Sequence, residues 1–249
     1  MKVMGIIPAR FDSSRFPGKP LANICGHPMI WWVYHQCVKV KEFCFVCVAT
    51  DDERIQSCCE TNHIPVVMTS KDHKTGTDRV GEVAMVKKAD LYVNVQGDEP
   101  VINPEMIRET IRIFDDESVY FGSLRKEITD YDEINAYSTV KVVVNKNEDA
   151  LYFSRSVIPS NKKEDVKTKV YRHVGIYAYK RDFLLDFIQM PQSKLELGEG
   201  IEPLRAIENG YKIRVKETEY SSIGVDYPEH IAQVEEYIKA NHLDKAVVE

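Results

Sequence analysis

Residues 3–21 read Val3-Met4-Gly5-Ile6-Ile7-Pro8-Ala9-Arg10-Phe11-Asp12-Ser13-Ser14-Arg15-Phe16-Pro17-Gly18-Lys19-Pro20-Leu21. The apolar start predicts a first strand over Val3–Ile7, and Arg10, Arg15 and Lys19 place three cations within the next ten residues. A turn of small residues can aim backbone N–H groups at phosphates, and Arg and Lys add fixed positive charge. A solvated cationic loop would have the same composition, and the Walker A pattern is absent. The stretch therefore indicates a strand followed by a loop that either binds phosphate or faces solvent.

Outward from this stretch, strands alternate with helices through the first 120 residues. Strands are predicted over Val3–Ile7, Phe43–Ala49, Pro65–Met68, Leu91–Gln96 and Val119–Leu124. Helices are predicted from Pro28, over Thr77–Lys88 and from Asn103-Pro104, because apolar residues recur there at helical spacing or a capping residue precedes Pro. This alternation predicts an α/β fold with a mostly parallel sheet flanked by helices, whose strands end at one ligand-binding edge.

The pattern changes near residue 125, where β-branched and aromatic runs take over. Strands are expected over Val140–Val144, Ala150–Phe153 and Val174–Tyr179, with short helices between them. The charged segment Ser160–Lys169 predicts an exposed loop, and a last helix is expected over Pro228–Asn241. Because there is no internal repeat and no Pro/Gly/Ser linker, we expect one domain over residues 1–249 with an inserted β-rich region at about 125–190.

Composition narrows the classes of function. The chain has 249 residues, a net charge of −6 and a pI of about 5.7, which argues against nucleic-acid binding as the main activity. It has no run of 18 apolar residues, so no membrane span is expected. The N-terminus continues into the first strand and is not typical of a signal peptide, which predicts a cytoplasmic protein.

All six cysteines lie in the first quarter of the chain, and Cys44 and Cys47 form a C-x-x-C pair. Such a pair raises zinc or redox chemistry. The run Phe43–Val48 around it is instead typical of a buried parallel strand, and no second pair completes a tetrahedral site. We therefore expect structural, reduced thiols, without a disulfide or zinc.

Carboxylates stand at two further element ends. The stretch Val93-Asn94-Val95-Gln96-Gly97-Asp98-Glu99-Pro100 predicts a strand with an acidic pair at its carboxyl end. Carboxylates there could hold Mg²⁺, which takes oxygen ligands, or could belong to a plain acidic turn. Asp226 precedes a helix predicted to begin at Pro228, so it is either a helix cap or a second metal-holding carboxylate.

A fourth group of polar residues flanks the strands of the β-rich region. Arg155, Arg172 and His173 lie where apolar runs begin or end, within Leu151–Pro159 and Tyr171–Tyr179. An Arg fork suits a substrate carboxylate, whereas His173 could equally be a satisfied histidine at a strand edge.

Taken together, these segments resemble the CMP-Kdo synthetase (3-deoxy-manno-octulosonate cytidylyltransferase) family over nearly the whole chain and in the same order. The residues that carry the resemblance are Ile7–Arg10, Ser14-Arg15, Pro17–Leu21, Val48–Asp51, Met68–Ser70, Gly76–Arg79, Asn94–Pro100, Val140–Val143, Ala150–Arg155, His173–Tyr177 and Gly224–Asp226.

The resemblance implies a nucleotidyltransferase-type, Rossmann-like domain and a homodimer formed through the inserted β-rich region. It implies Mg²⁺ as the cofactor, held by Asp98 and Asp226. The implied catalytic residues are Arg10, Arg15, Lys19, Asp98 and Asp226. The implied nucleotide-binding residues are Pro8, Ala9, Arg10, Ser13, Lys19, Ser70, His73, Gly76, Thr77, Gln96 and Asp98. The implied acid-sugar site consists of Arg155, His173, Tyr177 and Glu202.

The activity implied by the resemblance joins CMP from CTP to an acidic sugar, with release of pyrophosphate, in lipopolysaccharide or capsule biosynthesis. Two alternatives stay open: another anionic acceptor, such as an amino-substituted Kdo, another acid sugar or a phosphonate, and a catalytically silent nucleotide-binding regulator. The chain departs from the family at Pro203, where members have Gln, and Gly198 and Gly200 lower the helix propensity before it. Because Pro donates no side-chain hydrogen bond, we expect CTP use typical of the family but a reduced preference for Kdo.

Overall fold

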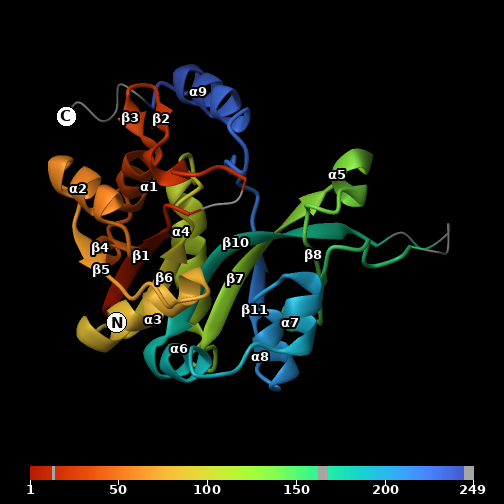
Figure 1. The fold of residues 1–249 in the computed structure, drawn as a ribbon. Helices are drawn as coiled ribbons and strands as arrows, with labels where there is room; N and C mark the ends of the chain where they lie inside the picture. The colour runs from red at the N-terminus through yellow and green to blue at the C-terminus, as the bar shows by residue number, and fades with distance from the viewer. Residues whose placement is uncertain (13–14, 162–165, 167, 244–249) are drawn as a thin grey trace. The chain divides into compact units, whose positions relative to one another are not determined.

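The computed structural model describes residues 1–12, 15–161, 166 and 168–243, and its elements are shown in Figure 1. The chain folds as two compact units. Unit 1 comprises Met1–Arg108 and the C-terminal part of the chain from Ser221, and unit 2 comprises Glu109–Tyr220. The β-rich region expected at about 125–190 lies within unit 2.

Unit 1 contains a parallel sheet whose strands follow the order β6-β1-β4-β5. Its strands are β1 (Val3–Ala9), β4 (Phe43–Thr50), β5 (Val66–Met68) and β6 (Leu91–Val95). Ile6 pairs with Cys47 on one side and with Asn94 on the other, which places β1 in the interior of these strands. Every residue of β6 is buried, as expected for a parallel strand covered on both faces.

The remaining elements of unit 1 are mostly helices. They are the 3-10 helix η1 (Lys19–Leu21), the short strands β2 (Asn23–Ile24) and β3 (His27–Pro28), the helices α1 (Met29–Cys37), α2 (Glu53–Thr61), α3 (Gly76–Val86) and α9 (His230–Ala240), and the first part of α4 (Pro104–Arg112), which continues into unit 2. Thr75 and Asp78 form a capping box at the start of α3. Pro28 is the extended residue before α1 and not its first helical residue, because it pairs with Asn23 in the β2–β3 hairpin.

Unit 2 is built on strand β7 (Phe121–Ile128), which pairs antiparallel with β10 (Val170–Lys180) and parallel with β11 (Arg214–Glu217). Strand β8 (Lys141–Val144) pairs antiparallel with both β10 and β9 (Ala150–Ser154). The helical elements are η2 (Ile113–Asp115), α5 (Tyr131–Asn135), α6 (Arg181–Phe187), α7 (Lys194–Glu199) and α8 (Leu204–Glu208). The pairing of β10 with β7 shifts register between Val174 and Tyr177, so β10 bulges there.

The predicted α/β class, a mostly parallel sheet flanked by helices, is confirmed, and its antiparallel pairs include β7–β10, β8–β10, β8–β9 and the β2–β3 hairpin. Helix α2 and strand β11 were not predicted. The loop predicted over Ser160–Lys169 falls partly on residues 162–165 and 167, which lie outside the described residues. The single-domain assignment and the dimerising role of the β-rich region stay predictions.

The cysteines differ in burial. Cys37, Cys47 and Cys59 are buried, and burial raises the pKa of Cys47 and of Cys59 to about 12. Cys44 is exposed, so its predicted burial is wrong. The reason is that β4 becomes fully buried only from Val46 onward, and its first three residues stay accessible.

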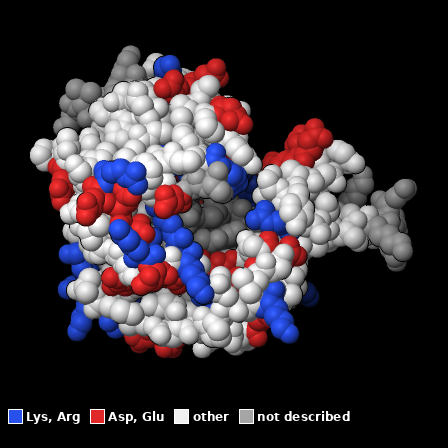
Figure 2. Space-filling view, in the orientation of Figure 1, with Lys and Arg blue, Asp and Glu red and all other residues white. Residues whose placement is uncertain are grey.

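On the face shown in Figure 2, Lys and Arg side chains are interspersed with Asp and Glu and do not merge into one basic surface. This distribution agrees with the low pI. No helix among the described residues has the length and apolar character needed to cross a bilayer.

Candidate active site

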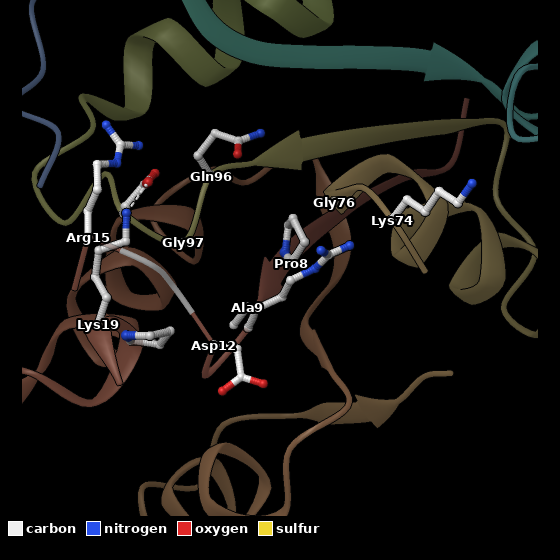
Figure 3. Close-up of a pocket in the computed structure, with 12 residues that line it drawn as sticks. Pro8, Ala9, Asp12, Arg15, Lys19, Lys74, Gly76, Gln96 and Gly97 are labelled. Atoms are coloured by element: carbon white, nitrogen blue, oxygen red, sulfur yellow. Dashed lines mark hydrogen bonds and ion pairs between the residues drawn. The ribbon is translucent and has the colours of Figure 1, made fainter. Parts of the chain in front are cut away.

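A pocket of about 410 Å³ lies in unit 1, where strands β1 and β6 end (Figure 3). Ligands in parallel α/β sheets usually bind beyond the carboxyl ends of the strands, which is where this pocket lies. Its lining residues are Pro8, Ala9, Arg10, Asp12, Arg15, Lys19, Pro20, Lys74, Gly76, Gln96, Gly97 and Asp98.

The loop after β1 is shaped by Phe11 and Gly18. The N–H of Gly18 donates to the carbonyl of Phe11 at 2.9 Å, and Gly18 adopts a left-handed φ of 71° immediately before Lys19. The Arg54 guanidinium carbon lies 3.2 Å from the centroid of the Phe11 ring, while Asp52 accepts two hydrogen bonds from the Arg54 side chain. The contact between Phe11 and Gly18 closes the loop after β1, and Lys19 then begins η1 at the pocket. The predicted Ser13 lies outside the described residues.

Gly97 allows the ends of β1 and β6 to approach each other. A Cβ at this position would lie 2.8 Å from the carbonyl oxygen of Pro8, closer than real Cβ atoms come to a neighbour. Because that neighbour is backbone, it cannot move away without displacing β1. Gly97 is therefore required by the packing beneath the pocket.

Two ion pairs join segments that are distant in sequence. Lys19 Nζ lies 2.6 Å from Asp98 Oδ2 and donates to the Val225 carbonyl at 3.0 Å. Arg15 lies 2.8 Å from Asp226 Oδ1, and the Val225 N–H donates to the Asp98 carbonyl at 2.9 Å. The predicted catalytic residues Arg15, Lys19, Asp98 and Asp226 thus come together at one point.

The structure excludes one of the two interpretations of Asp226. Helix α9 begins at His230 with Glu229 at the N-cap position, so Asp226 does not cap it. The carboxylate of Asp226 faces Arg15 instead, and its side chain is 47% exposed.

The carboxylates of Asp98 and Asp226 fit a Mg²⁺ site. Both supply the oxygen ligands that this ion takes, and both remain accessible, with side-chain exposures of 35% and 47%. Among the described residues, no three His, Cys, Asp or Glu side chains form a metal-binding group. Water and nucleotide phosphates, which commonly complete Mg²⁺ coordination, would therefore supply the remaining ligands.

The segment before α3 forms a second wall of the site. His73 Nε2 lies 2.5 Å from Glu82 Oε2, which also accepts the Ser70 N–H at 2.8 Å. Burial opposes ionisation of Glu82, but the hydrogen bonds from Ser70 and His73 outweigh it and lower the pKa of this carboxyl. The His73 carbonyl accepts a hydrogen bond of 2.7 Å from Arg10. His73 therefore contacts the pocket residue Arg10 through its backbone.

Some of the predicted nucleotide-binding residues line the pocket and others do not. Pro8, Ala9, Arg10, Lys19, Gly76, Gln96 and Asp98 line the pocket. Ser70, His73 and Thr77 are absent from the described lining. The side chain of Thr77 is buried and lies 3.4 Å from Asn94 Nδ2. Asp12 and Lys74 line the pocket but were missed, although Lys74 precedes the Gly76-Thr77 motif by two residues.

Three of the predicted acid-sugar residues are associated in unit 2. His173 lies 5.3 Å from Tyr177 and 5.0 Å from Phe153, measured between ring centroids, beside the bulge in β10. Burial lowers the pKa of His173 to about 3, so its imidazole is neutral near pH 7. Burial, with the charge of Glu202 adding to it, raises the pKa of Tyr177. The Ser123 hydroxyl lies 3.0 Å from His173 Nε2.

Arg155 is bound mainly to backbone carbonyls. Its Nε donates to the Glu199 carbonyl at 2.8 Å, and one terminal nitrogen donates to Tyr137 and Ser138 at 3.1 and 3.3 Å. The carboxylate of Glu199 accepts the Arg155 N–H at 3.0 Å. The Nζ of the buried Lys141 donates to the Arg155 carbonyl at 2.6 Å. Arg172 lies apart from this group, 3.6 Å from Glu133.

Gly200 and Pro203, in the segment that departs from the family pattern, stand at the end of one helix and the start of the next. Gly200 ends α7 in a left-handed conformation with φ 65°, where glycine is favourable, and Pro203 stands at the start of α8, where its missing N–H leaves no helical hydrogen bond unmade. Arg205 donates two hydrogen bonds to the buried Glu196 at 2.8 and 2.5 Å. The low helix propensity of Gly200 therefore costs α7 nothing, because this residue ends the helix.

Comparison with known proteins agrees with this site. Residues 4–213 match the family model described as cytidylyltransferase. The 3-deoxy-manno-octulosonate cytidylyltransferase of Solibacter usitatus is 45% identical over 243 residues, covering 97% of this chain and 96% of the relative. The protein of the same name from Geobacter metallireducens is 47% identical over 247 residues, covering 95% and 97%.

Solved structures support the same assignment. A structure of CMP:2-keto-3-deoxy-manno-octonic acid synthetase complexed with CTP aligns with a TM-score of 0.92 and 41% identity, covering 97% of this chain and 100% of that chain. A 4-diphosphocytidyl-2C-methyl-D-erythritol synthase from Anaerococcus prevotii, with a TM-score of 0.62 and 16% identity, shares the fold alone. The chain belongs to the cytidylyltransferase family and, within it, to the 3-deoxy-manno-octulosonate cytidylyltransferases.

Proposed function

We propose that this protein transfers the cytidylyl group of CTP to the acidic sugar 3-deoxy-manno-octulosonate (Kdo), forming CMP-Kdo and pyrophosphate. The observation that carries the proposal is the pairing of Lys19 with Asp98, both of which line the pocket, and of the pocket residue Arg15 with Asp226. This arrangement supplies cations for a triphosphate and carboxylates for its metal ion. The names of the relatives that share 44–47% of this sequence support Kdo as the acceptor.

In the proposed reaction, the anomeric hydroxyl oxygen of the sugar forms a bond to the α-phosphorus of CTP. The bond from that phosphorus to the oxygen bridging to the β-phosphate breaks, pyrophosphate leaves, and the hydroxyl proton passes to solvent. Phosphoryl transfer depends chiefly on positioning and charge neutralisation. Lys19, Arg15 and Arg10 would supply the fixed positive charge.

The ion pairs also explain how the positive charges of the site are compensated when no nucleotide is bound. Without nucleotide, Lys19 and Arg15 are neutralised by Asp98 and Asp226. With nucleotide, the phosphates would take over the two cations, and the carboxylates would become available to hold Mg²⁺. The bound ion would add charge neutralisation at the phosphates.

For the acceptor, we propose the group in unit 2 formed by His173, Tyr177, Glu202 and Arg155. A neutral His173 and a protonated Tyr177 can both donate hydrogen bonds to sugar hydroxyls. Arg155 would bind the sugar carboxylate by exchanging its bonds to Tyr137 and Ser138, which are its two longest, at 3.1 and 3.3 Å.

One observation favours a different acidic acceptor. Pro203 is buried at the start of α8 and carries no side-chain donor where the family pattern has Gln. A pocket that lacks one donor discriminates less well for the hydroxyl which that donor would bind. Comparing kcat/KM for Kdo with that for an amino-substituted Kdo, in the wild type and in Pro203→Gln, tests this alternative.

We further propose a homodimer formed through the β-rich region, acting in the cytoplasm on the route to lipopolysaccharide or capsule. Leu151, in the β-rich region, is 57% exposed and supports a protein contact there. Light scattering on the purified chain measures the oligomeric state directly.

The deciding experiment incubates the protein with CTP, Mg²⁺ and a panel of acid sugars and follows pyrophosphate. We expect release only when CTP, metal and Kdo are all present, and formation of CMP-Kdo in equal amount. Release with another sugar alone would support the alternative acceptor. CTP binding without turnover on any acceptor would identify a silent regulator.

A further inference from the structure

The pocket in unit 1 contains a cation that the sequence motifs did not indicate. Lys74 lines the pocket and is exposed. Figure 3 shows it beside Gly76, across the pocket from Arg15 and Lys19. In this view its side chain extends away from Arg15 and Lys19, so it would turn inward to give a bound nucleotide positive charge on a second side.

The backbone that carries Lys74 is held on both sides. Its own N–H and that of Thr75 donate to Asp78 Oδ2 at 3.0 and 2.9 Å. The preceding residue, His73, binds Glu82 through its ring and Arg10 through its carbonyl. The root of the lysine side chain is therefore fixed at the pocket wall.

The ammonium of Lys74 differs from the other cations of the lining. Lys19 and Arg15 each face a carboxylate, and Arg10 donates to the His73 carbonyl. Within the part of the chain that the structure describes, no hydrogen bond or ion pair engages the Lys74 ammonium. A phosphate can bind Lys74 without displacing a protein partner, whereas binding Lys19 or Arg15 requires an exchange.

We propose that Lys74 is a nucleotide-binding residue that captures the triphosphate of CTP in the ground state. The inference rests on the proposed function and adds a residue to the same site. Because the contact forms before any exchange of ion pairs and has no paired carboxylate, Lys74 contributes to KM for CTP and not to the chemical step. A uniform contribution to binding changes KM while leaving kcat unaltered.

The test compares Lys74→Ala with Lys71→Ala by direct titration of CTP without acceptor and by steady-state kinetics. Lys71 lies three residues earlier, is exposed and is not among the residues that line the pocket, so it is a matched control. We expect Lys74→Ala to raise Kd and KM for CTP about three- to fivefold, the size of an exposed ion pair. We expect kcat to change by less than about twofold.

Two further readouts separate charge capture from a structural effect. The decline of CTP affinity with added salt should be shallower in Lys74→Ala than in the wild type, and Lys74→Arg should restore affinity. CMP, with fewer charges, should lose less affinity than CTP.

Equal Kd values for CTP in Lys74→Ala and Lys71→Ala would overturn the inference. So would a change in KM for the sugar alone, because Lys74 would then serve the acceptor. Failure of the wild type to bind CTP would instead refute the proposed function, so the two failures are distinguishable.

Discussion

At the scale of single residues, the site depends on charges that are neutralised in the free protein and released to a ligand. Lys19 is 13% exposed in its side chain and lies between Asp98 and the Val225 carbonyl, which gives it a defined position. Arg15 and Asp226 form the more exposed pair, at 52% and 47%. The better-buried pair should therefore be the more sensitive to substitution.

The first prediction concerns the two carboxylates. Asp98→Asn and Asp226→Asn should each lower kcat by more than about a hundredfold, because each removes negative charge from the proposed Mg²⁺ site. Both side chains are partly exposed, so the thermal midpoint should stay close to that of the wild type. Kinetics across a Mg²⁺ titration, alongside circular dichroism, measures both quantities. Wild-type turnover in either variant would remove that residue from the metal site.

The second prediction concerns Lys19. Lys19→Ala should lower kcat/KM for CTP by about 10²- to 10³-fold, because a cation aimed at the phosphates stabilises the transition state in a fixed geometry. Lys88→Ala, an exposed lysine after α3, is the control and should behave as the wild type. Unchanged CTP kinetics in Lys19→Ala would make Lys19 a partner of Asp98 only.

At the scale of elements, the site exists because strand ends and helix starts are brought into close packing. The junction of β1 and β6 relies on a missing side chain at Gly97, and the junction of α7 and α8 relies on the buried pair of Glu196 and Arg205. Both features can be tested with substitutions that leave the rest of each element intact.

The third prediction compares two glycines. Gly97→Ala should destabilise the fold and weaken CTP binding, because its Cβ would meet the Pro8 carbonyl at 2.8 Å. Gly198→Ala in α7 meets nothing within 4 Å and should stabilise the protein by about 0.5–1 kcal/mol through helix propensity. Urea unfolding with CTP titration measures the contrast. A Gly97→Ala protein as stable as the wild type would show that β1 and β6 separate easily.

The fourth prediction concerns the buried pair in α7 and α8. Glu196→Gln should cost about 3 kcal/mol of unfolding free energy, because the Arg205 charge stays buried without its main partner. Asp186→Asn, on the exposed side of α6, should leave stability unchanged. Urea unfolding of both variants at neutral pH checks the difference.

The same pair predicts a pH dependence. Burial alone would raise the pKa of Glu196, but hydrogen bonds from Arg205 and the Ser193 N–H outweigh it and lower this pKa. A carboxyl whose folded pKa lies below its unfolded pKa stabilises the fold above the unfolded value, about 4.3. That contribution is lost as the pH falls from there through the folded pKa. As the pH falls below 5, the unfolding free energy of the wild type should therefore drop more than that of Glu196→Gln. The variant has no carboxylate at this position and so has no such contribution to lose. An equal drop in both proteins would contradict this prediction.

At the scale of the whole molecule, stability should come from packing and not from covalent or metal cross-links. The three buried thiols lie in α1, β4 and α2, and burial raises their pKa values, which suppresses the reactive thiolate. The fifth prediction is that reductant or a zinc chelator leaves the thermal midpoint unchanged, although activity still requires added Mg²⁺. Scanning calorimetry measures this, and stoichiometric zinc by elemental analysis would refute it.

Local sequence predicted most of the elements that carry the site. Four parallel strands of unit 1 and four of its helices follow from apolar runs and caps, because periodicity and turn chemistry are read over a few residues. Helix α2 was missed because only Ile55 and Cys59 of its nine residues are buried, which leaves a weak apolar pattern. Strand β11 was missed because Arg214–Glu217 alternates charged residues with a single buried valine.

The candidate site was predicted as a set of residues but not as an arrangement. Arg15, Lys19, Asp98 and Asp226 could be chosen from their positions after strands and from the family pattern, whereas the hydrogen-bond partners of Ser70, His73 and Arg155 could not be foreseen. His73 contacts the pocket residue Arg10 through its carbonyl, and Arg155 binds backbone oxygens, because hydrogen-bond partners are set by the fold around them.

The sequence by itself determined most of the segments that become strands and helices, and that a cationic loop follows the first strand. Only the tertiary structure decided that Lys19 meets Asp98, 79 residues away, and Val225, 206 residues away. The physical reason is one of range. Backbone preference and apolar periodicity act between neighbours along the chain, whereas an ion pair forms where sheet register and close packing, such as that of Gly97 on Pro8, bring distant charges within about 3 Å of each other.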